Sequence, residues 1–196
     1  MVAVVADPEV DVGDFRETVA LVEPLRAEVL AEHRELERIG APAARFGDRP
    51  FEQRRAEDLA AFLEEYRSVE RYRADLANPA KRVQLAEIDG KPAAYCLIVF
   101  GHQFDERPEP RPERPVFISQ LYCAPDMTGH GLGAALIEWA IAEARGSGAD
   151  ALQLSVFSEN FGAQRFYRRY GFEHVADIDF WVGDHRDDEF LYELAL

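Results

Sequence analysis

The chain is poor in cysteine, methionine and lysine, and it lacks any long apolar run. It has two residues each of cysteine, methionine and lysine among 196. Cys96 and Cys123 fall in apolar, strand-like stretches without CxxC spacing, which indicates reduced core residues. No apolar run approaches the roughly 20 residues that cross a bilayer, and Asp7 ends the apolar start too early for a signal peptide. We therefore expect a cytoplasmic protein with no membrane partner and no metal.

Positive charge is also scarce. The chain has 37 acidic and 22 basic residues, a net charge of -15, and twenty of the basic residues are arginines. This balance argues against nucleic acid as a partner. An acidic field would steer a cationic amine toward the protein at low salt, although a well-solvated surface explains the same charge. The length fits a single domain over residues 1–196.

Apolar periodicity predicts a protein of mixed helices and strands. Amphipathic helices are expected over 15–39, 51–76, 132–146 and 160–170. Strands are expected over 2–5, 82–88, 92–100, 115–123, 151–157, 172–182 and 189–194, with turns at 89–90 and 184–187. The strand at 151–157 follows a strand–helix unit and should lie parallel to 115–123. The charged, proline-rich segment 105–115 is expected to project as a solvated connection.

Three alternating glycines precede the helix that begins near Leu132. Gly129, Gly131 and Gly133 let the backbone turn tightly and leave its N–H groups bare. Bare amides at the positive end of a helix attract phosphate. Gly129-x-Gly131-x-x-Ala134 also satisfies a dinucleotide fingerprint. However, residues 124–128 separate it from the strand, and the first candidate acid, Glu159, comes about ten residues beyond the usual interval of ~20.

A second motif follows the next strand and reads Asn160-x-x-Ala163-x-x-x-Tyr167-x-x-x-Gly171-Phe172. Together with the glycine loop, it resembles the GNAT superfamily of acetyl-CoA-dependent N-acetyltransferases over roughly 115–175. Thr128 stands where that family usually has Gln or Arg. The resemblance implies an α/β (α+β) fold with a mixed, mostly antiparallel central sheet, flanked by about four helices. One parallel strand pair would splay apart after Cys123 and near Phe157.

The resemblance also implies a site for acetyl-CoA as cosubstrate. Its diphosphate would lie on the amides of the glycine loop, and its pantetheine arm would pair like an added strand with backbone near Leu121 and Cys123. A backbone N–H near Tyr122 would stabilise the oxyanion. Tyr167 would be the catalytic acid, or a hydrogen-bond donor to the sulfur. The implied cofactor-binding residues are Leu121, Tyr122, Cys123, Thr128, Gly129, His130, Gly131, Leu132, Gly133, Ala134, Asn160 and Tyr167.

The general base is not identified by the sequence. Ser119 stands near the position where several relatives have a glutamate. The base would then be water or a remote carboxylate, and Glu87 and Glu32 are the candidate carboxylates. The implied reaction moves an acetyl group to a primary amine of a small molecule by direct attack in a ternary complex. A non-catalytic acyl-CoA sensor or scaffold, and a peptide N-terminal or lysine acetyltransferase, remain open alternatives. A homodimer remains open as well.

Overall fold

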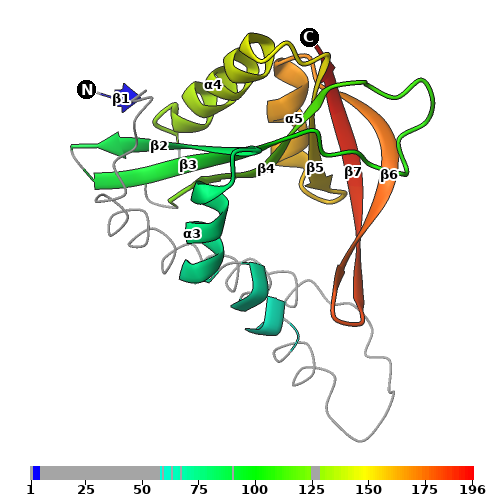
Figure 1. Ribbon diagram of the computed structural model, residues 1–196, viewed down its shortest axis with the longest axis horizontal. Helices are drawn as coiled ribbons and strands as arrows, with labels where there is room; N and C mark the ends of the chain where they lie inside the picture. Colours follow the sequence, from blue (N-terminus) through cyan, green and yellow to red (C-terminus); the bar gives the residue numbers. More distant parts are fainter. Residues whose placement is uncertain are drawn as a thin grey trace, which may run out of the picture.

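The computed structural model of the protein describes residues 2–4, 58, 60–62, 64–66, 68–89, 91–124 and 129–196 (Figure 1). Its seven strands form one sheet in the order β1-β2-β3-β4-β5-β7-β6. Among the strands of the described residues, β4 and β5 alone pair in parallel, which confirms the predicted mixed, mostly antiparallel sheet. The strands are β1 Val2–Val4, β2 Lys81–Ile88, β3 Lys91–Phe100, β4 Pro115–Cys123, β5 Ala151–Phe157, β6 Glu173–Val182 and β7 His185–Ala195. The described helices are α3 Val69–Ala77, α4 Leu132–Gly146 and α5 Phe161–Arg169.

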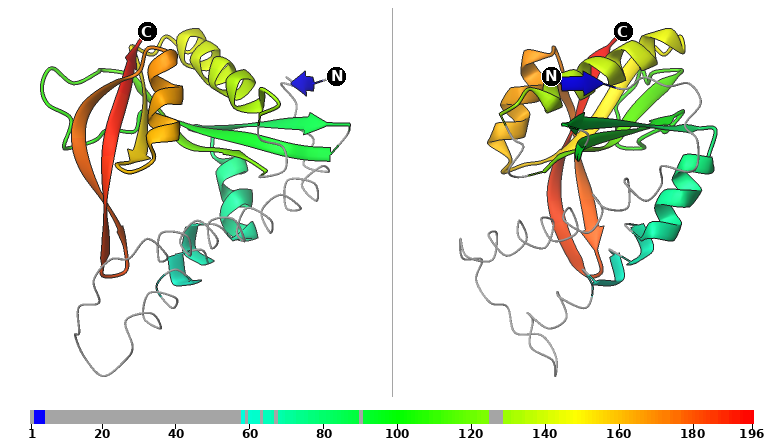
Figure 2. Two further views of the ribbon diagram at one scale, coloured as in Figure 1. Left: turned by 180° about the vertical axis from the view of Figure 1, so that it is seen from behind. Right: turned by 90° about the vertical axis from the view of Figure 1, so that its left-hand side faces the viewer.

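The helices lie on both faces of the sheet. Figure 2 shows α4 and α5 on one face and α3 on the other. The main core is on the α4 face, because the buried stripe of α4 packs there against apolar residues of β2 to β5. A smaller cluster around Tyr72 and Tyr95 lies under α3. None of the helices in the described part of the chain is long and apolar enough to span a membrane.

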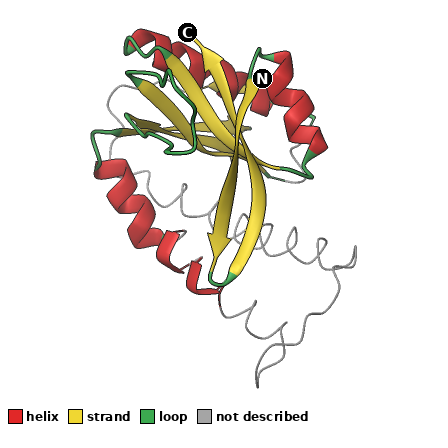
Figure 3. Cartoon of the chain, turned by 90° about the vertical axis from the view of Figure 1, so that its right-hand side faces the viewer, coloured by secondary structure: helices red, strands yellow, loops and turns green. Residues whose placement is uncertain are grey.

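Several predicted boundaries move in the structure. Helix α3 begins after Ser68, an extended N-cap whose hydroxyl accepts from the Arg71 N–H at 3.3 Å, so the helix predicted over 51–76 is interrupted. The turn predicted over 184–187 is wrong, because β7 already begins at His185. The β6–β7 pair therefore forms a long hairpin (Figure 3). The helix expected over 15–39 lies outside the described residues.

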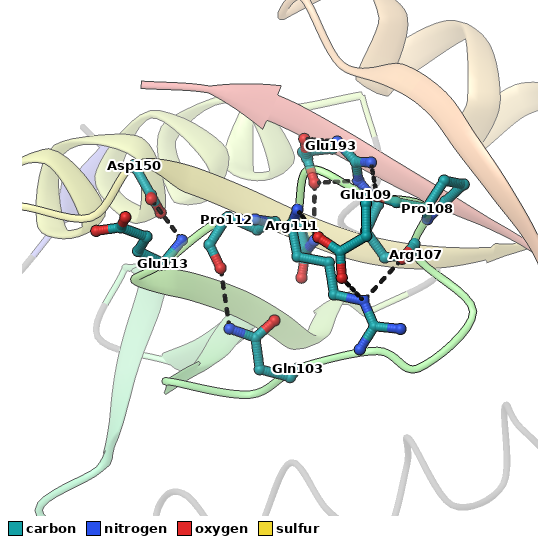
Figure 4. A network of polar contacts seen from close by, with 10 residues as sticks. Gln103, Arg107, Pro108, Glu109, Arg111, Pro112, Glu113, Asp150 and Glu193 are labelled. Carbon is teal, nitrogen blue, oxygen red and sulfur yellow. Dashed lines mark hydrogen bonds and ion pairs between the residues drawn. The ribbon is translucent and has the colours of Figure 1, made fainter.

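The charged connection before β4 is held against the sheet by a half-buried ion pair (Figure 4). The Arg107 guanidinium donates to both carboxylate oxygens of Glu193 on β7, at 2.9 and 2.8 Å. Gln153 on β5 donates to the same carboxylate at 2.8 Å. The Glu113 and Arg114 N–H groups donate to Asp150, which fixes the end of the connection. Most residues of the connection are exposed, as expected for a solvated segment, and Arg107 ties it to β7.

Candidate active site

The parallel pair β4 and β5 separates partway along its length. Paired positions run from Pro115–Ala151 to Ile118–Leu154. Beyond that point β4 continues beside β3 as far as Cys123, and β5 continues beside β7 as far as Phe157. The split therefore opens earlier than the expected positions at Cys123 and Phe157. A register shift accompanies it, because Leu97 faces Gln120 and Ile98 faces Ile118, which leaves Ser119 without a partner on β3.

Every second backbone N–H group of β4 faces this split. The Ala124 N–H donates to the Ala93 carbonyl of β3 at 2.8 Å. Because N–H groups alternate in direction along a strand, the Tyr122 N–H also faces β3, whereas the N–H groups of Leu121 and Cys123 face the split. A donor for a ligand in the split is thus expected at Leu121 or Cys123 rather than at Tyr122 itself.

The glycine loop leads directly into α4. Gly129 and Gly131 have φ values of 81° and 80°, in the left-handed region that favours glycine. Gly131 is the N-cap and has no side-chain cap, and the first helical bond runs from Ala135 N–H to the Gly131 carbonyl at 3.0 Å. The N–H groups of Leu132, Gly133 and Ala134 consequently lack partners within the helix. His130 is exposed, and Thr128 lies outside the described residues.

Gly133 brings the start of α4 close to the end of β4 and to α5. A Cβ placed at Gly133 would lie 3.7 Å from the Phe166 ring and 4.0 Å from the Cys123 sulfur. By contrast, a Cβ at Gly129 or Gly131 would have no heavy atom within 4 Å. The inner glycine is therefore a packing position, whereas the outer two present open backbone.

Helix α5 is anchored to the end of β5. The Asn160 side-chain oxygen accepts from the Ala163 N–H at 3.0 Å and caps the helix, so this residue has a structural role as well as its predicted binding role. The buried Gln164 amide donates to the carbonyls of Phe157 and Ser158, at 3.3 and 2.8 Å. Gly171, with φ at 89°, ends the helix as expected.

Tyr167 lies on the α4 face beside the end of β4. Its half-buried ring contacts Phe166 and Phe172, with centroids 5.2 and 5.8 Å apart. Burial raises the pKa of the Tyr167 phenol above its usual range, and Cys96, Tyr122 and Cys123 add to this increase. The hydroxyl therefore stays protonated at neutral pH and can donate a hydrogen bond.

The opposite face of the sheet carries polar groups that the sequence analysis did not select. The hydroxyls of Tyr72 and Tyr95 both donate to the Gln120 side-chain oxygen, at 3.0 and 2.6 Å, and all three residues are buried. Nearby in the sheet, Ser155 on β5 is the diagonal neighbour of Glu189 on β7. Alternation along β7 places Glu189, Leu191 and Glu193 on one face. The strand register pairs Glu189 with Phe157 at the end of β5, so β5 lies between Glu189 and the split.

Of the two candidate bases from the sequence, the structure describes one. Glu87 lies on β2, with β3 between it and β4. Glu32 lies outside the described residues. Within the described part of the chain, no three or more His, Cys, Asp or Glu residues form a group that could hold a metal ion.

Comparison with known proteins identifies the class to which this fold and site belong. The model of the acetyltransferase (GNAT) family matches residues 48–172. An uncharacterized N-acetyltransferase from Mycobacterium tuberculosis is 30% identical over 135 residues, which are 69% of this chain and 80% of that protein. The thialysine N-epsilon-acetyltransferase of Bos taurus is 26% identical over 112 residues, 57% of this chain and 65% of that protein.

A solved structure of a GNAT N-acetyltransferase shares this fold. The PaiA N-acetyltransferase from Thermoplasma acidophilum in complex with coenzyme A has a TM-score of 0.63 and 15% identity, and the match covers 100% of this chain and 99% of that one. The chain belongs to the GNAT acetyltransferase family, and it is an acyltransferase.

Proposed function

We propose that this protein transfers the acetyl group of acetyl-CoA to a primary amine of a small molecule, by direct attack within a ternary complex. The observation that carries the proposal is the split between β4 and β5, which opens beside the uncapped head of α4. A thioester needs a slot with backbone donors, and a diphosphate needs bare amides at a helix start. Both features adjoin the end of β4.

The cosubstrate would be bound mainly by backbone groups. The amides around Gly129 to Ala134 and the positive end of α4 would bind the diphosphate, with His130 exposed at this loop and Thr128 just before it. Leu121 and Cys123 would pair with the pantetheine arm, and the side-chain nitrogen of Asn160 would donate from the β5 side, because its oxygen already caps α5. An acidic protein can thus bind an anionic ligand without lysine.

The acceptor is proposed to be a cationic small amine. The net charge of -15 would attract a positively charged substrate. The bovine relative is named for acetylating the epsilon nitrogen of thialysine, which supports a small molecule with a primary amine.

Release of free thiol from acetyl-CoA tests the proposal. The protein should release thiol in proportion to added amine, measured over a panel of small primary amines, and a peptide with a free N-terminus should be a poorer acceptor. Calorimetric binding of coenzyme A without amine-dependent thiol release would instead identify an acyl-CoA-binding sensor or scaffold. Absence of coenzyme A binding would contradict the proposal as a whole.

Tyr167→Phe is expected to lower kcat about 10- to 100-fold and to change KM for acetyl-CoA little. A hydrogen bond to a charged group contributes ~1.5–3 kcal/mol, and the departing sulfur gains negative charge only as the reaction proceeds. Steady-state kinetics check this effect. Tyr170→Phe is the matched control, since Tyr170 ends the same helix and also contacts Phe166, at 5.2 Å. Full turnover in Tyr167→Phe would remove the proposed role.

A further inference from the structure

We propose that Glu189 is the general base that takes the proton from the attacking amine, and that Ser155 positions its carboxylate at the split. This inference rests on the proposed function and assigns a proton acceptor within the same site. It is carried by the strand register, which places a half-buried carboxylate opposite the last residue of β5, across that strand from the split.

The amine must approach from the α3 face. On the other face, α4 and α5 pack their apolar side chains against the sheet as part of the main core. Tyr167 belongs to that packed face, together with Cys96 and Cys123. A thioester lying in the split would therefore have its sulfur side near Tyr167, and its carbonyl would be open only from the opposite face.

Ser155 and Glu189 lie on that opposite face. Ser155 is the first residue of β5 after Leu154, which is the last one paired with β4. Leu154 and Val156 point into the core with α4, so Ser155 and Phe157 point away from it. Glu189 is directly opposite Phe157 and shares its face, and Ser155 is its diagonal neighbour on that face.

The surroundings of Glu189 suit a proton acceptor. Burial raises the pKa of the Glu189 carboxyl, Asp187 on the same strand adds to the increase, and the Ser155 hydrogen bond opposes it. Asp187 is itself 2.9 Å from the His185 ring nitrogen, and β6 faces Glu189 with the apolar Ile178. A carboxyl whose pKa is raised toward the working pH is a better base than an exposed one.

The proposed reaction forms one carbon–nitrogen bond and breaks one carbon–sulfur bond. The amine nitrogen forms a bond to the thioester carbon, and Glu189 receives the proton that the nitrogen loses. The carbon–sulfur bond breaks, and its electron pair leaves on sulfur as a thiolate that the Tyr167 hydroxyl stabilises. Glu189 then returns its proton to solvent. The thiolate takes up a proton from solvent.

Glu189→Gln tests the role, because it keeps the shape of the side chain and removes the base. We expect kcat to fall about 100-fold and KM for acetyl-CoA to stay unchanged. The increase of kcat with pH that depends on deprotonation of Glu189 should be absent. The acceptor's own ionisation is common to both enzymes, so the difference between their pH profiles reports Glu189. Glu159→Gln, at an exposed residue just after β5, is the matched control and should leave kcat and its pH profile unchanged.

Two further measurements separate catalysis from structure. Glu189→Gln should be at least as stable to urea as the wild type at neutral pH, because a carboxyl with a raised pKa costs the folded state stability once it ionises. In Ser155→Ala, loss of a hydrogen bond that lowers the Glu189 pKa should move the rising limb of kcat to higher pH.

Near-wild-type kcat in Glu189→Gln, or a lower kcat with an unchanged pH profile, would overturn the inference. A loss of activity matched by loss of urea stability would also overturn it, by showing a structural role. No amine-dependent thiol release by the wild-type protein would instead overturn the proposed function, and the role of Glu189 with it.

Discussion

Replacing Gly131 with glutamate is expected to abolish binding of acetyl-CoA. Gly131 is the N-cap residue of α4, and no side chain caps the helix there. A Cβ added at Gly131 would have no heavy atom within 4 Å. A glutamate side chain would occupy the space proposed for the diphosphate and would place a negative charge against it. We expect no heat of binding when coenzyme A is titrated into the variant in a calorimeter, and no thiol release.

The same substitution also strains the backbone, since Gly131 has φ at 80°. Gly101 offers a matched control, because it has φ at 75° and also has no heavy atom within 4 Å of an added Cβ. It lies at the end of β3 rather than at the head of α4. Gly101→Glu should lose a similar ~1–2 kcal/mol of stability and still bind coenzyme A. Equal binding by both variants would contradict the proposed phosphate site.

Arg107→Ala is expected to destabilise the protein by about 3 kcal/mol at neutral pH. The side chains of Arg107 and Glu193 are only 17% and 12% exposed, and two short hydrogen bonds join them. Removing the arginine leaves a largely buried carboxylate that, among the described residues, keeps a hydrogen bond from Gln153, and breaking a buried pair typically costs ~3–5 kcal/mol. Urea unfolding monitored by fluorescence measures the change.

The pH dependence of this effect follows from Glu193. The Arg107 hydrogen bond is the largest cause that lowers the pKa of the Glu193 carboxyl. A lowered pKa contributes stability above the ordinary carboxyl value of ~4.3, and this stability is lost as pH falls through the folded-state pKa. The difference between wild type and Arg107→Ala should therefore shrink below about pH 4.

Arg111→Ala is the control for Arg107→Ala, because it removes an arginine from the same connection. Its ion pairs with Asp105 and Glu109 are 3.5 Å long and involve exposed carboxylates. Exposed pairs of this kind contribute roughly 0–1 kcal/mol. Equal costs for the two variants, or a cost for Arg107→Ala that does not change with pH, would contradict the assignment of a buried, stabilising pair.

Local chemistry made much of the fold predictable. The Asp89 turn, the helix that starts after Gly131 and the Asn160 cap each depend on residues close in sequence. Apolar runs likewise predicted β4 and β5, and the helix between them predicted their parallel pairing. The β7 start was missed because His185 to Asp188 is charged, yet these residues pair along the hairpin with Asp179 to Val182. Cross-strand pairing there outweighs local preference.

For the candidate site, the sequence alone identified the glycine loop, Asn160 and Tyr167 as candidates. Each belongs to a short motif whose geometry depends on residues close in sequence. Tertiary structure decided where β4 and β5 part, which side of β4 offers donors, and that Ser155 meets Glu189. It also joined Arg107 to Glu193, which are 86 positions apart. Such contacts depend on strand register and on a shift at Ser119, and a one-residue change of register turns every side chain to the other face.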